Sequence, residues 1–334
     1  MTSVAGCSSV ISPPPYEAET AWEPGVPMAT ERTEVIATVL DNKLYVIGGI
    51  EPGRVASTTV AIFDPNVGSW EVGPPLPVGL HHTTAVAHDG NIYVVGGYQN
   101  QWDPVNTVYQ FDGSTWTERK PMPTVRGALA AAVHDGRIYA TGGVGIDDVT
   151  NAFEIYDIEA DTWSSGPAMP TAREHLTAAV VDGNFYAIGG RMGNLFSNLR
   201  TTERYDPTTN EWQAVAAMPT ARSGFGATTV NGVIVVMGGE SPNGTNSQVE
   251  VYNPAEDTWS ALPDMPTPRH GLGVATLGNR IFAAAGGPEP GFVYSDAVEV
   301  LTFENAAFDQ VTRTVESFFC NLPIVGGLLR GSLC

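Results

Sequence analysis

The sequence predicts an all-β protein of six four-stranded antiparallel sheets arranged around one axis, and three observations support this prediction. Paired glycines recur through nearly the whole 334-residue chain at intervals of 46 to 49 residues. Tryptophans follow the same interval, once in each repeat. Turn-forming pairs such as Asp89-Gly90 and Asn231-Gly232 separate short apolar runs, which indicates β-hairpins. The glycine pairs are Gly48-Gly49, Gly96-Gly97, Gly142-Gly143, Gly189-Gly190, Gly238-Gly239 and Gly286-Gly287, and the tryptophans are Trp22, Trp70, Trp116, Trp163, Trp212 and Trp259.

One repeat, residues 173–212, shows how four strands follow from the sequence. The apolar run at 175–181 ends at the Asp182-Gly183 turn, and a second run at 185–190 ends in the glycine pair. After a variable loop, two further short segments follow, the last with Trp212. Such a unit cannot bury its own faces, whereas six units stacked around an axis bury all of them.

The two ends of the repeated region complement each other. The last unit has three strands, ending at 297–303, and no tryptophan strand follows it. Trp22 precedes the first unit without strands of its own. We therefore predict that residues 19–25 supply the fourth strand of the last sheet, which closes the ring and leaves no unpaired inner edge.

Together these features resemble the kelch repeat. The carrying motifs are the glycine pair after the second strand, an aromatic residue on the third strand, a tryptophan on the fourth and a Met-Pro-x-x-Arg connector, which occurs as "AMPTAR" at both 168–173 and 217–222. The resemblance covers about residues 20–303 and implies a six-bladed kelch β-propeller. We expect an N-terminal tether at 1–18, the propeller at 19–303 and a C-terminal amphipathic helix with a tail at 304–334.

In this topology the connectors share one face with the loops between second and third strands, and the Asp-Gly hairpins lie on the other face. The hairpins are nearly uniform, whereas the loops differ in sequence from repeat to repeat, as "YQNQWDPVNT" and "RMGNLFSNLR" illustrate. Repeated parts hold a scaffold and variable parts carry selectivity, so the loop side is the candidate ligand face.

The connector arginines allow two interpretations. They either hold the framework by hydrogen-bonding loop carbonyls, or they form a ring of cations that binds carboxylates of an acidic peptide or sugar. The kelch resemblance implies the second interpretation, because residues in this zone often grip ligands. We include all five among the candidate ligand-binding residues: Arg32, Arg126, Arg173, Arg222 and Arg269.

Histidines near the connectors are further candidates. His82 and His175 stand two places after the arginine position, where the first repeat has Glu34, and His270 stands one place after it. Such residues could share a metal, form an acid/base pair or line a wet channel. Because no His-x-His or Glu-x-x-His spacing occurs, we predict no metal site and no cofactor, and we assign these four residues to ligand binding.

Trp102 lies outside the tryptophan period, in a variable loop. An exposed ring there could stack on a sugar or anchor a partner protein, or it could fold over the mouth of the channel as a loop core. We include Trp102 among the ligand-binding candidates.

Charge and motifs exclude several functions. The net charge of −20 repels nucleic acids and anionic lipids. Nucleotide-binding, serine-hydrolase and zinc-protease motifs do not occur. Galactose oxidase, a kelch-type copper enzyme, needs a cysteine-linked tyrosine, and the three cysteines of this chain lie outside the repeats, at Cys7, Cys320 and Cys334.

The chain ends carry signals of their own. Residues 4–7, "VAGC", resemble a lipobox, so a lipid on Cys7 would tether the propeller outside the cell. If the given N-terminus is genuine, we expect a cytoplasmic protein. Apolar residues at spacings of three and four predict an amphipathic helix at 304–320. In an oxidising compartment Cys320 and Cys334 could form a disulfide.

These expectations lead to a principal hypothesis and two rivals. The principal one is a monomeric, extracytoplasmic recognition module without catalytic activity, which binds a protein or glycan through its variable-loop face. The alternative is an enzyme that acts on an acidic sugar in the axial pocket, similar to the kelch-type sialic-acid mutarotases. A purely structural repeat protein is the third.

Overall fold

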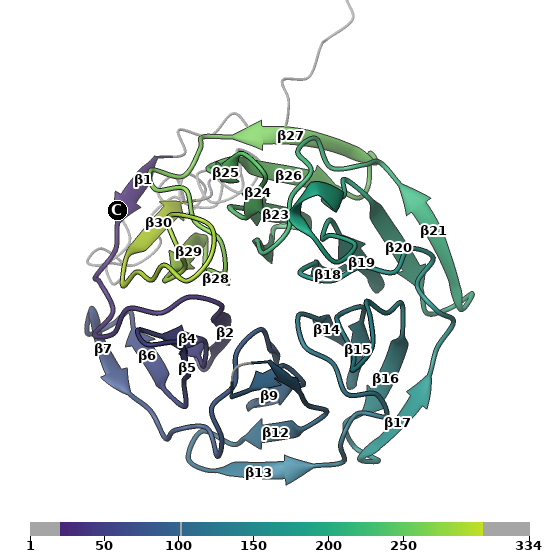
Figure 1. Cartoon of the computed structure of the whole chain (residues 1–334), viewed down its shortest axis with the longest axis horizontal. Helices are drawn as coiled ribbons and strands as arrows, with labels where there is room; N and C mark the ends of the chain where they lie inside the picture. The colour runs from purple at the N-terminus through teal and green to yellow at the C-terminus, as the bar shows by residue number, and fades with distance from the viewer. Residues whose placement is uncertain (1–20, 101, 303–334) are drawn as a thin grey trace, which may run out of the picture.

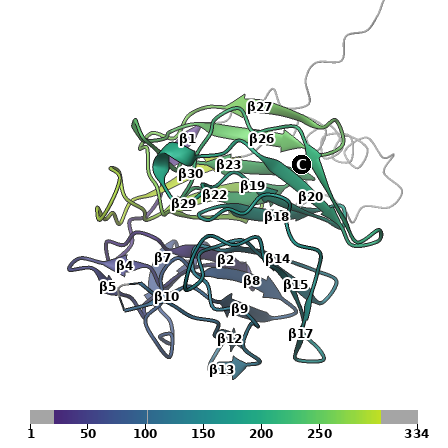
Figure 2. The same ribbon diagram turned by 45° about the vertical axis from the view of Figure 1, so that its right-hand side comes forward.

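Six four-stranded antiparallel sheets surround a central axis in the computed structural model, which describes residues 21–100 and 102–302 (Figure 1). The first strand of each blade lies nearest the axis, and these strands neighbour one another around it (Figure 2). The predicted six-bladed all-β fold is confirmed. The first strands are β2 (Ile36–Leu40), β8 (Thr84–His88), β14 (Ala130–His134), β18 (Thr177–Val181), β22 (Gly226–Val230) and β28 (Gly273–Leu277).

The remaining strands follow outward in each blade. Second strands are buried almost throughout, because neighbouring blades cover both of their faces, whereas the fourth strands are largely exposed. The second strands are β3 (Lys43–Ile47), β9 (Asn91–Val95), β15 (Arg137–Thr141), β19 (Asn184–Ile188), β23 (Val233–Met237) and β29 (Arg280–Ala284). The third strands are β6 (Val60–Asp64), β12 (Val108–Phe111), β16 (Phe153–Asp157), β20 (Thr202–Asp206), β26 (Val249–Asn253) and β30 (Val298–Thr302). The fourth strands are β7 (Ser69–Val72), β13 (Trp116–Arg119), β17 (Thr162–Ser165), β21 (Glu211–Val215), β27 (Thr258–Leu262) and β1 (Trp22–Pro24).

Strand β1 completes the last blade, as the sequence predicts. It pairs antiparallel with β30, with Trp22 opposite Leu301 and Pro24 opposite Glu299. The Gly25 N–H then donates to the Val298 carbonyl at 2.7 Å. The N-terminal segment therefore closes the ring through noncovalent contacts and covers the outer edge of β30.

The six periodic tryptophans hold neighbouring blades together. Each indole Nε1 donates to a backbone carbonyl of a connector in an adjoining blade, at 2.8 to 2.9 Å. In five blades the same ring packs on an aromatic side chain of the third strand, as Trp70 does on Phe63 with 5.3 Å between ring centroids. Each tryptophan thus joins its own sheet to the next one.

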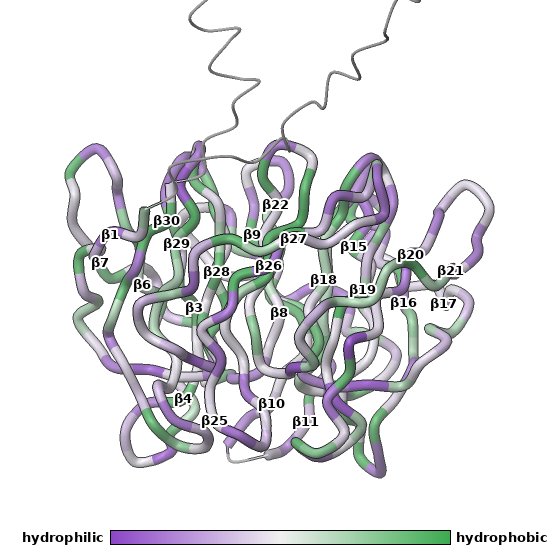
Figure 3. Tube along the Cα trace, turned by 90° about the horizontal axis from the view of Figure 1, so that it is seen from above, coloured by the Kyte–Doolittle hydropathy of each residue, from purple (hydrophilic) through white to green (hydrophobic). Residues whose placement is uncertain are grey.

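Connectors and variable loops share one face. Each connector forms a single backbone bridge to the loop that begins after the second strand, for example Thr33 with Ile50 and Glu174 with Arg191. Short ribbons rise from three of these loops, and Figure 3 places their labels along one edge of the disc. They are β4 (Ile50–Glu51) with β5 (Val55–Ala56), β10 (Tyr98–Gln99) with β11 (Asp103–Pro104), and β24 (Glu240–Ser241) with β25 (Gly244–Thr245); a 3-10 helix, η1 (Leu195–Ser197), occupies a fourth loop.

The glycine pairs fix how second strands meet the next connector. The Gly143 N–H donates to the Arg173 carbonyl at 3.0 Å. Gly143 has a φ of +101°, a backbone conformation that residues with a side chain rarely adopt. In the last blade the equivalent residues are Ala285 and Gly286, because Ala285 has a φ of +58° and the Gly286 N–H donates to the Arg32 carbonyl. The glycine pair predicted there, Gly286-Gly287, is therefore out of register by one residue.

Three expectations fall outside the described residues: the tether with Cys7, the helix at 304–320 and the Cys320–Cys334 pair. Within residues 21–100 and 102–302, no helix is long and apolar enough to span a membrane.

Candidate functional site

Six backbone segments meet at the axis and form a hydrogen-bonded ring. In each blade the residue two places after the connector arginine position adopts a left-handed conformation, with φ between +49° and +62°. In five blades the N–H of the ring residue donates to the carbonyl of the ring residue before it. In the first blade the Val35 N–H donates to the Gly271 carbonyl and completes the circle, and the six distances are 2.8 to 3.3 Å. We call these six residues the axial ring: Glu34, His82, Ala128, His175, Gly224 and Gly271.

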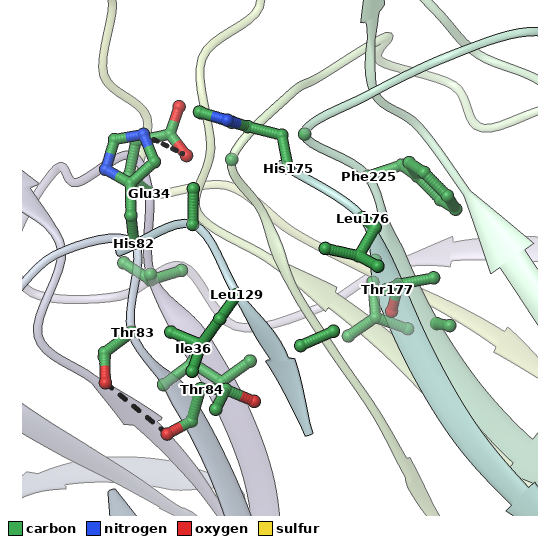
Figure 4. Close-up of a pocket in the computed structure, with 18 of the residues that line it drawn as sticks. Glu34, Ile36, His82, Thr83, Thr84, Leu129, His175, Leu176, Thr177 and Phe225 are labelled. Carbon is green, nitrogen blue, oxygen red and sulfur yellow. Dashed lines mark hydrogen bonds and ion pairs between the residues drawn. The ribbon is translucent and has the colours of Figure 1, made fainter. Parts of the chain in front are cut away.

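Three ring positions carry functional side chains, and the three converge. One ligand-type atom from each of Glu34, His82 and His175 lies within 4.8 Å of the others. Figure 4 shows His82 joined to Glu34 by an ion pair, with His175 reaching toward them from across the axis. The other ring positions, one between His82 and His175 and two between His175 and Glu34, hold only alanine and glycine and bring no polar side chain to the axis.

Neighbouring histidines surround the Glu34 carboxylate. His82 Nε2 lies 3.3 Å from Glu34 Oε2, and His270 Nε2 lies 3.3 Å from Glu34 Oε1. The second ring nitrogen of each histidine also has a partner: His82 Nδ1 is 2.6 Å from His81 Nδ1, and His270 Nδ1 is 3.1 Å from the Gly287 carbonyl. These contacts orient the imidazoles around one carboxylate.

Arg191 links the other side of the site. Its Nε donates to Glu174 Oε1 and its Nη1 donates to Glu240 Oε1, both at 2.6 Å. Its Nη2 lies 3.3 Å from the ring nitrogens of His175, whose Nδ1 also pairs with the Glu174 carboxylate. One guanidinium is thus balanced by two carboxylates next to the axial ring.

Burial controls protonation at the site. It raises the pKa of Glu34 to about 7, an effect opposed by the charge of His270. Burial, followed by the neighbouring charge of His175, lowers the pKa of His82 well below its usual value. Burial and then Arg191 lower the pKa of His175 in the same way. Both imidazoles are therefore neutral at pH 7, and the carboxyl group exchanges its proton near neutrality.

Cavities lie on both sides of the triad. The cavity on the loop side has a volume of about 300 Å³, and its walls include Arg191, Glu240 and Asn194. The cavity within the channel has about 150 Å³ and is lined by the first strands of the blades (Figure 4). Glu34, His82 and His175 line both, so they separate the loop-side cavity from the channel.

Aromatic side chains cover part of the loop-side cavity. The Trp102 ring packs against His81 and His82, with centroids 5.3 Å away in each case, and reaches Phe292 at 6.4 Å. The Arg54 guanidinium lies 4.2 Å above Phe292. Trp102 nevertheless stays 50% exposed, so its ring both covers the mouth and remains accessible to a ligand.

The five connector arginines lie elsewhere. Each is 0% exposed and donates to backbone carbonyls inside its blade, as Arg269 does to Ala285 and Ala297 at 2.8 Å. A fully buried guanidinium cannot contact a ligand at the mouth, so the expected ring of cations is not present there. Of the two interpretations that the sequence leaves open, the framework one describes Arg32, Arg126, Arg173, Arg222 and Arg269.

In four blades the arginine also pairs with a buried glutamate on the third strand, such as Glu299 at 2.8 Å from Arg269. In the first blade Ala61 takes the glutamate position opposite the second strand, and in the second blade Tyr109 does, where Leu80 replaces the arginine. Wherever a buried glutamate occupies this position, its arginine is present, which keeps buried charge balanced.

Three residues beside the axial ring, Glu174, Arg191 and Glu240, are not among the ligand-binding residues predicted from the sequence. The residue after a connector arginine bridges the residue after a glycine pair, and two residues of the second kind, Arg191 and Glu240, line the loop-side cavity. Aligning the repeats at these two positions would have identified all three residues. His81 occupies the same position after the connector in the second blade.

Fold and site together define a closed β-propeller whose loop face carries a cavity on the axis, lined by both apolar and ionisable side chains. The family model described as "KLHDC2/KLHL20/DRC7 Kelch-repeats domain" matches residues 34–218, more than half of the chain. A second family model, described as "Kelch motif", matches residues 221–266. The chain belongs to the kelch-repeat family. No curated protein sequence matches it. Kelch propellers generally bind proteins, so the fold indicates a protein-interaction module.

Proposed function

We propose that this protein is a recognition module that docks a partner protein on its loop face, the surface formed by the loops between second and third strands. Membership of the kelch family supports a binding role. The distribution of exposed apolar side chains supports the choice of face and of a protein as the partner.

Exposed apolar side chains gather on the loop face. Nine large hydrophobic residues are exposed within the described part of the chain, and six of them lie in these loops. Phe196 is 89% exposed and Ile146 is 78% exposed, although burying each would remove unfavourable contact with water. A surface rich in such residues is typical of a protein-binding site. The six are Val55, Trp102, Ile146, Met192, Phe196 and Phe292.

The loop-side cavity would receive one side chain of the partner. Trp102 and Phe292 offer rings at its mouth, and Arg191 and Glu240 offer charges in its wall. Aromatic residues around a pocket are the usual centre of a protein interface. A preference for acidic ligands loses its basis, because the arginines that suggested it are buried.

Affinity capture with the purified full-length chain tests the proposal. Protein from the source cells is bound to the immobilised chain, identified by mass spectrometry and then titrated as a pure protein. We expect a partner whose affinity falls at least about tenfold for Phe196→Ser and for Trp102→Ala, because interface anchors typically contribute more than about 1 kcal/mol. Val72→Ser is the matched control: Val72 is 78% exposed but lies on the outer strand of the first blade.

Two outcomes would contradict the proposal. Equal binding of the partner to the wild type and both loop variants would exclude the loop face as the binding site. A glycan array on which the protein binds a sugar in a Trp102-dependent manner, with no protein partner captured, would replace the protein ligand by a glycan.

The alternative of an enzyme acting on an acidic sugar finds less support. It needs free cations beside Glu34 and His175 to hold the sugar carboxylate. The connector arginines are buried, and Arg191 already has two carboxylate partners. We therefore propose the binding function alone.

A further inference from the structure

We propose that Glu34, His82 and His175 bind one divalent transition-metal ion, Zn²⁺ or a similar first-row ion, on the propeller axis. The inference goes beyond the proposed binding function, because a docking surface does not require an ion beneath it.

Donor types and spacing match such an ion. Two imidazole nitrogens and one carboxylate oxygen form a common ligand set for Zn²⁺ and Fe²⁺. Two ligand atoms at about 2.0–2.1 Å from a tetrahedral ion lie about 3.3 Å apart. His82 Nε2 and Glu34 Oε2 are already 3.3 Å apart, and the ligand atom of His175 lies within 4.8 Å of them. Small side-chain movements would bring all three onto one ion.

The backbone brings these donors together from three blades. Each one stands in the axial ring, where hydrogen bonds to both neighbouring ring segments fix the position of its Cα. The arrangement therefore relies on the ring and not on long, flexible side chains. A set of donors held this way loses little conformational freedom when it binds an ion.

The groups that contact the Nδ1 atoms favour coordination through Nε2. The Nδ1 of His175 pairs with the Glu174 carboxylate, and the Nδ1 of His82 contacts His81. A carboxylate on the remote nitrogen of a ligating histidine fixes its tautomer and strengthens it as a donor. His175 has this arrangement without any ion present. Its Nε2 lies 3.3 Å from Arg191 Nη2, so the guanidinium has to withdraw from Nε2 when an ion binds there.

Charge balance also favours a divalent cation. With Glu34 ionised, the site holds three carboxylates, those of Glu34, Glu174 and Glu240, and one guanidinium, that of Arg191, which pairs with the last two. This leaves two negative charges largely shielded from water. A divalent ion would neutralise both.

An ion at this position would keep a coordination site open. The three other ring residues, Ala128, Gly224 and Gly271, have no donor side chains. The loop-side cavity of about 300 Å³ lies directly beside the triad. Metal sites with three protein ligands and an open position bind water or an exchangeable ligand.

Zinc stoichiometry and histidine NMR test the inference. The full-length chain is prepared without a histidine tag and with its three cysteines, which are also zinc ligands, replaced by serine. After dialysis against Zn²⁺ we expect one zinc per chain. We also expect Zn²⁺ to shift strongly the imidazole ¹⁵N signals of two of the six histidines. Binding of less than about a tenth of an equivalent of Zn²⁺, Co²⁺ and Fe²⁺ alike would overturn the proposal.

Substitutions locate the ion. His82→Ala and His175→Ala should each abolish stoichiometric binding, and both should fold, because Ala128 occupies the same ring position with a φ of +54°. Glu174→Gln should weaken binding by about 10- to 100-fold, as removal of the hydrogen-bond partner of a ligating histidine does. His88→Ala, on the hairpin side of the disc, is the control that should retain full binding. Unchanged zinc content in both ring variants would overturn the assignment, and if a variant does not fold, the NMR shifts of the unsubstituted histidines decide.

Discussion

The indole Nε1 of Trp22 donates a 2.9 Å hydrogen bond to the carbonyl of Pro263. The five other periodic tryptophans make the same bond to their own connectors. The last blade, whose fourth strand comes from the N-terminal segment, is therefore joined to its neighbour by the same hydrogen bond as the five blades whose four strands are continuous in sequence.

This equivalence predicts that Trp22→Ala and Trp70→Ala destabilise the protein by similar amounts. Each substitution removes a half-buried ring and one hydrogen bond, so we expect a loss of about 2–4 kcal/mol in the free energy of unfolding. Urea unfolding followed by circular dichroism measures it. Val72→Ala, an exposed residue of the outer strand, should change stability by less than about 0.5 kcal/mol. A loss for Trp22→Ala as small as that of the control would show that β1 does not latch the ring.

The buried arginine–glutamate pairs predict strong coupling between partners. Arg269→Leu alone leaves Glu299 buried without its cation and should cost about 3–5 kcal/mol. The double variant Arg269→Leu/Glu299→Tyr copies the combination that the second blade already has in Leu80 and Tyr109, so it should lose less than the sum of the single variants. Chemical unfolding of all four proteins gives the coupling energy. If the stability losses of the two single variants add up to that of the double variant, Arg269 and Glu299 are not energetically coupled.

The axial ring predicts opposite effects of alanine and glycine. Gly224 has a φ of +62° and space for a Cβ, whose nearest contact would be 3.7 Å away, so Gly224→Ala should cost about 1 kcal/mol from backbone conformation alone. Ala128→Gly removes the same strain and should gain about 0.5–1 kcal/mol. Gly271→Ala should cost more, because its Cβ would lie 2.6 Å from Glu34 Cδ. Thermal unfolding ranks the three variants, and a stabilising Gly224→Ala would refute the argument.

Asp161 predicts a pH-dependent contribution to stability. Its Oδ1 accepts hydrogen bonds from the Tyr156 hydroxyl at 2.5 Å and from the Lys120 N–H at 2.9 Å. The Tyr156 bond lowers the pKa of Asp161 below its usual 3.8. The ionised form therefore stabilises the fold above that pH, and the contribution is lost as pH falls through the lowered pKa.

Asp161→Asn should accordingly be less stable than the wild type at pH 7, and the difference should narrow below pH 3.8. Because the side chain is 40% exposed, we expect less than about 1 kcal/mol. Urea unfolding at pH 7, 4 and 3 provides the comparison. A difference that stays constant with pH would mean that the charge of Asp161 contributes nothing.

Much of the fold could be predicted from the sequence because its signals are periodic. The glycine pairs and tryptophans repeat the same local geometry, and Trp22 without a partner strand indicated how the ring closes. The predicted position of the glycine pair in the last blade was wrong by one residue, because Ala285 adopts a left-handed conformation that glycine has in the other blades. A left-handed alanine leaves no sign in the sequence.

The site was harder to predict. Periodicity placed Glu34, His82 and His175 at equivalent positions, but the distances across the axis depend on the radius of the ring. A repeated arginine looks the same whether it faces a ligand or a strand end, and only burial distinguishes the two. Arg191 begins a variable loop, and the repeat pattern places it beside Glu174 but does not indicate its bond to Glu240 of the next blade.

The circle of backbone hydrogen bonds at the axis has no first or last member. In open repeat proteins the terminal units lack a neighbour and fray before the centre unfolds. Here every unit has a donor on one side and an acceptor on the other, from Glu34 around to Val35. No blade can unfold without breaking two of these bonds. We therefore expect the unfolding of one blade to destabilise its neighbours, so that the whole propeller unfolds cooperatively although it is built from repeats.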